Sequence, residues 1–257
     1  MRTVAGLLSI VVGLSGQCLV AQHLRFAEGS FGYVRSDGTE LIALGWLVSP
    51  SRFRAALCSR AQILQLTYVR KQAERPTSDV RQVANTFSNQ PGDVFRVMGG
   101  TGAAGETCYL SADTTLVASA GPVDGRDSGE CDGRQRRRMS EATHRTVLHC
   151  WRLGSAQGNV RFFAVQFGST DRSVLNSLVV IDQDGFFLHD FPKMDFSPNR
   201  VFSPKALSIL FFCHPRGAHV IGLTWGDVEG QDSYLLVADS ADTFRRVAAS
   251  YRYWFPY

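Results

Sequence analysis

The sequence has few lysines and, beyond its first 21 residues, no long apolar run. Only three of its 27 basic residues are lysines, so arginines carry most of the positive charge. These arginines are spread along the chain among acidic residues, whereas a nucleic-acid-binding protein more often gathers them on one stripe. The net charge of +4 therefore does not indicate a nucleic-acid partner. After residue 21 no stretch approaches the roughly 20 apolar residues of a transmembrane helix, so we expect no transmembrane segment in the mature protein.

The first 21 residues are typical of a secretory signal peptide. Met1 and Arg2 give a short positive start, and residues 4–16 are apolar or small throughout. Such a run is too short to span a bilayer but suits the apolar centre of a signal peptide. We predict cleavage after Ala21 and a secreted or periplasmic protein in which residues 22–257 form a single globular β-rich domain.

The chain has six cysteines, and cleavage would remove Cys18 and leave five. Cys18 follows a bulky polar residue where a lipid-attachment motif requires a small one, so we expect no lipid anchor. Exported proteins commonly oxidise their cysteines, and five cysteines allow two disulfides and one odd thiol. Cys108 and Cys131 bracket a loop-rich stretch and are the preferred pair. Cys150 and Cys213 lie in strand-like segments and are the candidates for a second disulfide.

Short segments of strand-like pattern, separated by turn residues, predict a β-rich fold. Asp37-Gly38 lies between two extended segments, 30–34 and 40–48, and indicates a hairpin because glycine tolerates the positive φ of a tight turn. Later segments are joined by hairpin-sized connections, which implies antiparallel pairing. Residues 161–167 are apolar on both faces, which indicates a sheet covered on both sides. We predict a β-rich α+β fold in which antiparallel sheets, as a sandwich or a curled sheet, carry two or three packed helices.

Two segments have apolar residues at helical spacing. They are residues 80–87, preceded by Ser78, and residues 244–251, preceded by Ser240. Residues 121–138 are instead polar, glycine-rich and highly charged, with a run of arginines at their end. This composition predicts a long charged surface loop.

Two short fragments resemble parts of chymotrypsin-like serine proteases. Asp127-Ser128-Gly129 is similar to the surroundings of their nucleophile, and His149-Cys150 is similar to the surroundings of their catalytic base. The resemblance covers only these few residues and implies Ser128, His149 and Asp127 as catalytic candidates. The order departs from the family, because serine precedes histidine here. Glu130 also stands where the family needs glycine and backbone donors for an oxyanion hole. No Gly-x-Ser-x-Gly motif occurs elsewhere in the chain.

Histidines and cysteines gather in two further segments. His144 and His149 lie in one, and Cys213, His214 and His219 lie in the other. Zinc and copper prefer imidazole and thiolate ligands, so these residues are candidate metal ligands. Neighbours on a strand point to opposite faces, however, and the spacings match no standard zinc pattern. A structural disulfide with ordinary histidines is the favoured interpretation, and we expect no cofactor.

None of these patterns defines an active site. We therefore expect an exported protein without enzymatic activity that binds a ligand, a protein or a glycan, or contributes to the cell envelope. A secreted hydrolase with a dispersed active site and a His/Cys metal-binding protein are the alternatives. An enzyme requires a histidine in a cleft, within hydrogen-bonding reach of a serine, an aspartate or a cysteine. A binding module requires an exposed aromatic patch instead.

Overall fold

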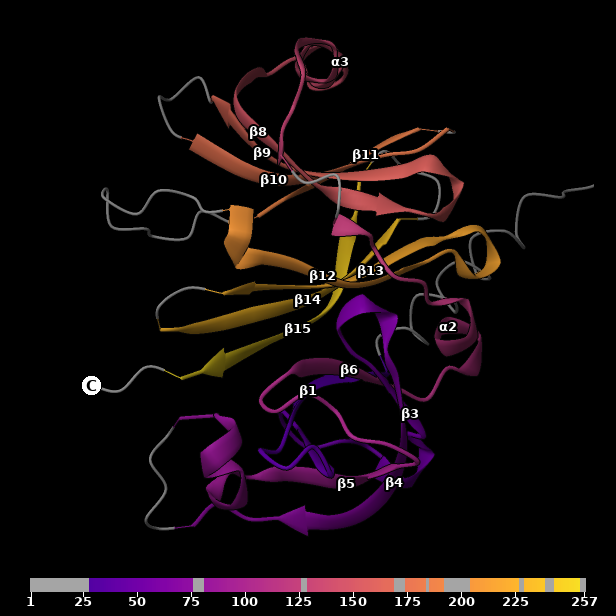
Figure 1. Ribbon diagram of the computed structural model, residues 1–257, viewed down its shortest axis with the longest axis vertical. Coiled ribbons are helices and arrows are strands. Elements are labelled where there is room, and N and C mark those ends of the chain that lie inside the picture. The colour runs from indigo at the N-terminus through magenta and orange to yellow at the C-terminus, as the bar shows by residue number, and fades with distance from the viewer. Residues whose placement is uncertain are drawn as a thin grey trace, which may run out of the picture.

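The structure, a computed structural model, describes most of the chain from residue 28 onward. The described residues are 28–75, 81–125, 129–168, 174–183, 185–191, 204–226, 229–238 and 243–254. Within them the chain forms one closed barrel and two open sheets, all antiparallel. Figure 1 shows these parts stacked, with a helix above one sheet, the second sheet in the middle and the barrel below. The predicted β-rich α+β fold is confirmed.

The N-terminal strands close into a six-stranded barrel in the order β1-β2-β5-β4-β3-β6. These strands are β1 (Ser30–Val34), β2 (Glu40–Ala43), β3 (Ala55–Leu57), β4 (Ile63–Gln72), β5 (Gly92–Met98) and β6 (Thr107–Ser111). The predicted β1–β2 hairpin is confirmed, because Val34 pairs with Leu41 and Gly38 has a φ of 74° in the turn. Apolar side chains fill the interior, among them Leu41, Leu66 and Phe95. Closure leaves no sheet edge within the barrel.

The later strands form two sheets, in the orders β11-β10-β9-β8-β7 and β12-β13-β14-β15. The five-stranded sheet contains β7 (Gly129–Glu130), β8 (Thr146–Ala156), β9 (Val160–Gly168), β10 (Val174–Ile181) and β11 (Phe186–Asp190). The four-stranded sheet contains β12 (Leu207–Cys213), β13 (His219–Gly226), β14 (Gly230–Ala238) and β15 (Arg245–Tyr253). The two sheets share a core in which Phe162 and Leu178 meet Ile221 and Leu236. They therefore form the predicted sandwich.

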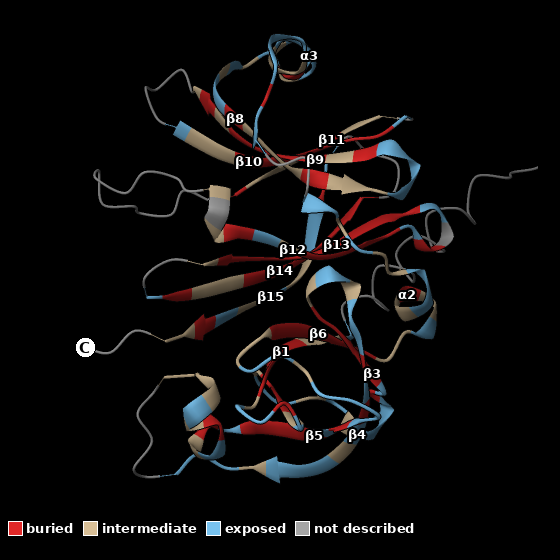
Figure 2. Ribbon diagram, viewed as in Figure 1, coloured by how far each residue is buried: buried red, intermediate tan, exposed pale blue. Residues whose placement is uncertain are grey.

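The double-sided apolar pattern of β9 places it between two cores. Phe162 and Ala164 face the sandwich core, whereas Phe163 and Val165 face a second core on the other side of the sheet. That second core is covered by α3 (Gly133–Thr143), whose buried residue is Met139. Figure 2 shows the resulting burial, with buried strands inside and exposed residues on the outer side of α3.

The four-stranded sheet also packs on both faces. Its second face carries Phe211, Val220 and Leu235, which meet Phe31 and Tyr109 of the barrel in one apolar cluster. The short helix α2 (Thr114–Ser119) adds Leu116 to this cluster. The barrel and the sandwich are thus joined by a continuous core.

Two sequence-based predictions of local structure are wrong. The predicted surface loop at 121–138 contains the first half of α3, which begins with a capping box in which Asp132 and Gln135 exchange hydrogen bonds. The predicted C-terminal helix is instead the strand β15. The other predicted helix is a six-residue 3-10 helix, η3 (Ala84–Asn89), and its expected start at Ser78 lies outside the described residues.

No helix among the described residues is long and apolar enough to cross a membrane.

Candidate functional site

The cysteines form two disulfides, Cys58–Cys108 and Cys131–Cys150, and Cys213 is a buried free thiol. Among the five cysteines that the structure describes, the predicted two disulfides and one odd thiol are confirmed, but both predicted pairings are wrong. Cys58 follows β3 and Cys108 lies in β6, and these strands are neighbours in the barrel. Disulfides of this kind are compatible with an oxidising extracellular or periplasmic compartment.

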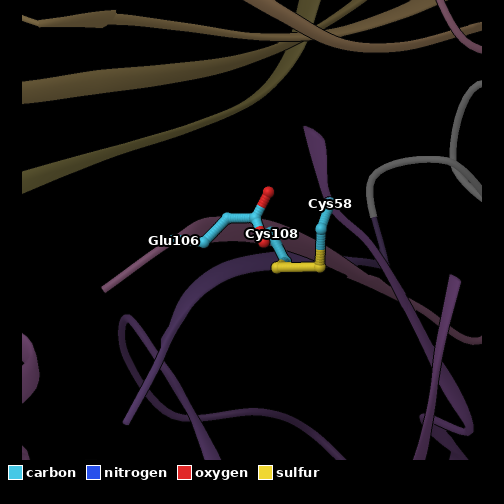
Figure 3. A group of neighbouring side chains, drawn as sticks. All are labelled: Cys58, Glu106 and Cys108. Carbon is cyan, nitrogen blue, oxygen red and sulfur yellow. A yellow bond between two sulfur atoms is a disulfide. The ribbon is translucent and has the colours of Figure 1, made fainter. Parts of the chain in front are cut away.

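A carboxylate lies beside the barrel disulfide (Figure 3). Among the described residues, one group has ligand atoms close enough together to hold a metal ion. It consists of Glu106, Cys58 and Cys108. Both sulfur atoms are joined in the disulfide, however, so neither is a thiolate ligand. The Oε1 atom of Glu106 instead accepts a hydrogen bond of 2.9 Å from the backbone N–H of Ser59. Glu106 therefore fixes the turn that follows Cys58.

Of the sequence-predicted catalytic candidates, His149 alone lies among the described residues. His149 is exposed on β8, and its ring stacks on Trp151 with centroids 5.6 Å apart. Ser128 and Asp127 lie outside the described residues. His144, a predicted metal ligand, is exposed at the C-terminal end of α3 in the left-handed conformation.

The remaining histidine candidates, His214 and His219, do lie side by side, with ring centroids 4.4 Å apart. His214 is exposed, whereas His219 is buried, and the Nε2 atom of His219 lies 3.0 Å from Oδ2 of Asp182. The other oxygen of Asp182 accepts a hydrogen bond of 2.6 Å from the N–H of Gly185 in the β10–β11 turn. Asp182 thus joins the five-stranded sheet to the four-stranded sheet through the buried His219.

Cys213 is a predicted candidate both for a disulfide and for a metal site. Among the described residues it forms no disulfide, and it belongs to no group of side chains that could hold a metal ion. It lies in the apolar cluster between barrel and sandwich. Burial raises the pKa of its thiol to about 12, which suppresses the reactive thiolate.

We therefore expect Cys213 to resist alkylation in the folded protein. Iodoacetamide in mildly alkaline buffer should leave the native mass unchanged. In protein that begins at Gln22, alkylation in urea without reductant should add one label, because Cys213 is the free thiol among the described cysteines, and reduction should add four more from the two disulfides. Intact-mass spectrometry reads all three states. A label on the native protein would contradict the burial of this thiol.

A surface pocket of about 410 Å³ lies beside the barrel. It is lined by the loop residues Trp46, Leu47 and Val48, by Arg52 and Phe53, and by Glu28. Trp46 is 52% exposed, which is unusual for so large an apolar ring. At its rim the guanidinium of Arg52 lies 3.1 Å from the carboxylate of Glu28. The pocket thus combines an open aromatic surface with one donor group and one acceptor group.

The Trp46 loop is anchored to the barrel on both sides of the ring. The backbone N–H of Leu47 donates a 2.7 Å hydrogen bond to the buried carboxylate of Asp93 in β5. Leu47 and Phe53 both pack into the barrel core. The ammonium of Lys71, in β4, lies 4.3 Å from the centre of the Trp46 ring. These contacts attach the Trp46 loop to the barrel and leave the ring at the surface.

Comparison of the chain with protein-family models, with curated proteins and with solved structures found no significant match.

Proposed function

We propose that the protein is an exported binding module without enzymatic activity, and that the Trp46 pocket is its ligand site. The observation that carries the proposal is the half-exposed Trp46 ring, held by the barrel at the mouth of a pocket. Covering such a ring is favourable, because tryptophan supplies a large apolar area and is enriched among the residues that dominate binding energies.

The anchoring of the loop supports the same proposal. A site whose ligand contacts are already ordered loses less conformational entropy when the ligand binds. Here the hydrogen bond from Leu47 to Asp93 and the position of Lys71 order the loop in the free protein. The two disulfides support the export part of the proposal, because disulfides persist in oxidising compartments.

The proposal is tested by producing the full chain in a secreting host with fluorotryptophan in place of its four tryptophans. The exported protein is expected to begin at Gln22. Its fluorine NMR spectrum should contain one resonance per tryptophan, and the Trp46→Phe variant assigns the resonance of Trp46. Titration with neutral oligosaccharides, with a mixture of unstructured peptides and with phospholipid vesicles should shift the Trp46 resonance saturably for one of these probes.

Trp225 provides the internal control, because it is buried in the sandwich core and should keep its resonance. A protein retained with its first 21 residues attached would contradict export. A Trp46 resonance that none of the three probes shifts would contradict the binding function of the pocket.

A further inference from the structure

We infer that the ligand of the Trp46 pocket is an uncharged, hydroxyl-rich ring, the pyranose ring of a neutral saccharide. The inference rests on the proposed function and names the ligand class of the same site. It follows from three features of the pocket, namely the accessible ring face, the balance of charge and the size.

The first feature is the arrangement around the indole ring. The ammonium of Lys71 lies over the ring, 4.3 Å from its centroid, and so occupies one of its two faces. Trp46 is 52% exposed despite this contact, and it is one of the residues that line the pocket. A pyranose ring presents a face of C–H groups that can lie flat against an aromatic ring, and burial of this apolar area is favourable.

The second feature is the charge at the rim. The carboxylate of Glu28 and the guanidinium of Arg52 are 3.1 Å apart, and both side chains are exposed. Among the residues that line the pocket, Glu28 and Arg52 carry the charges, one negative and one positive, so the lining favours neither an anionic nor a cationic ligand. Lys71, whose ammonium lies over the Trp46 ring, is not part of the lining. A hydroxyl group both donates and accepts hydrogen bonds. Neighbouring hydroxyls on one ring therefore match a carboxylate acceptor placed beside a guanidinium donor.

The third feature is the size and lining of the pocket. A volume of about 410 Å³ lies at the lower end of the roughly 300–1,000 Å³ that small-ligand pockets span. Phe53 is buried and supplies an apolar wall, whereas Val48 is almost fully exposed at the rim. The pocket therefore fits one or two sugar rings rather than a folded partner.

The test uses the exported, fluorotryptophan-labelled protein and defined oligosaccharides. Neutral oligomers of hexoses and of N-acetylhexosamines are titrated, alongside oligomers of uronic acids, unstructured peptides and phospholipid vesicles. A neutral oligosaccharide should shift the Trp46 resonance saturably. The Trp46→Ala variant, followed by ligand-detected NMR, should weaken that binding at least about tenfold. Arg52→Met and Glu28→Met should each weaken it too, because each removes one side of the hydroxyl-binding pair.

The matched control is Tyr251→Ala, which removes an aromatic side chain of similar exposure, 50%, on β15. It should bind the oligosaccharide as the wild type does. Unchanged resonances of the other tryptophans show that each variant is folded. Binding of peptides, vesicles or only the uronic-acid oligomers would overturn the saccharide inference but leave the binding function standing. A Trp46 resonance that responds to no probe would overturn both.

Discussion

Replacing both Cys58 and Cys108 with alanine is expected to lower the free energy of unfolding by about 4 kcal/mol, through the loss of the cross-link alone. The disulfide joins residues 50 positions apart in the sequence, and it ties β3 to β6 within the closed barrel. Without it the unfolded chain gains the entropy of an open loop, whereas the folded barrel keeps its strand pairing. Urea denaturation followed by circular dichroism measures the change.

The second disulfide and the free thiol supply the controls. Cys131 and Cys150 are only 19 positions apart, so their replacement by alanine should cost about 3 kcal/mol by the same loop-closure argument. The Cys213→Ala variant removes a buried thiol without opening a loop and measures the cost of the side chain itself. A Cys58/Cys108 variant that is no less stable than the Cys213 variant would contradict the role assigned to the barrel disulfide.

The sequence predicted the fold class because local patterns and tertiary structure agree over most of the chain. The apolar run 161–167 indicated a sheet with two covered faces, and β9 does lie between two cores. The pattern failed at β15, where a bulge opposite Leu235 and Leu236 interrupts the pairing. As a result the consecutive residues Val247 and Ala248 both pack toward the barrel cluster. The bulge broke the two-residue period of a strand and produced a spacing that is also typical of a helix.

The helix α3 was missed for a different reason. Its sequence is dominated by arginines, and only Met139 is buried, so no apolar stripe marked the helix. The available signal was the capping box of Asp132 and Gln135, a pair three residues apart that marks a helix start.

The candidate site was less predictable than the fold because it depends on contacts between distant segments. The sequence predicts an extended segment over residues 40–48 that includes Trp46, whereas β2 ends at Ala43 and the ring lies on a loop. The available signals of a loop were Gly45, directly before Trp46, and the pair Ser49 and Pro50 after it. The pairing of Cys58 with Cys108 depends on which strands are neighbours in the barrel, and sequence spacing does not encode this.

The end of β15 is attached to the barrel through one buried guanidinium. Arg252 is only 4% exposed, and it donates hydrogen bonds to the backbone carbonyls of Gln82 and Gly105 and to the hydroxyl of Thr107. It also lies 4.3 Å over the ring of Tyr33. Burial lowers the pKa of Arg252 to about 10, so the side chain stays charged at neutral pH. Its partners belong to β1, to β6 and to the segments that precede β6 and η3, so Arg252 binds several parts of the chain at once.

Replacing Arg252 with methionine is therefore expected to lower the free energy of unfolding by about 3 kcal/mol. Each buried acceptor left without a donor costs roughly 1–3 kcal/mol. Removal of the buried charge offsets part of this loss. Arg252→Lys should recover only part of the stability, since an ammonium lacks the planar fork of a guanidinium. Arg245→Met, an exposed arginine on the same strand, is the matched control. Hydrogen exchange should show the first loss of protection in β6 and at the end of β15. A variant at Arg252 as stable as the one at Arg245, with unchanged exchange at this junction, would contradict the role assigned to Arg252.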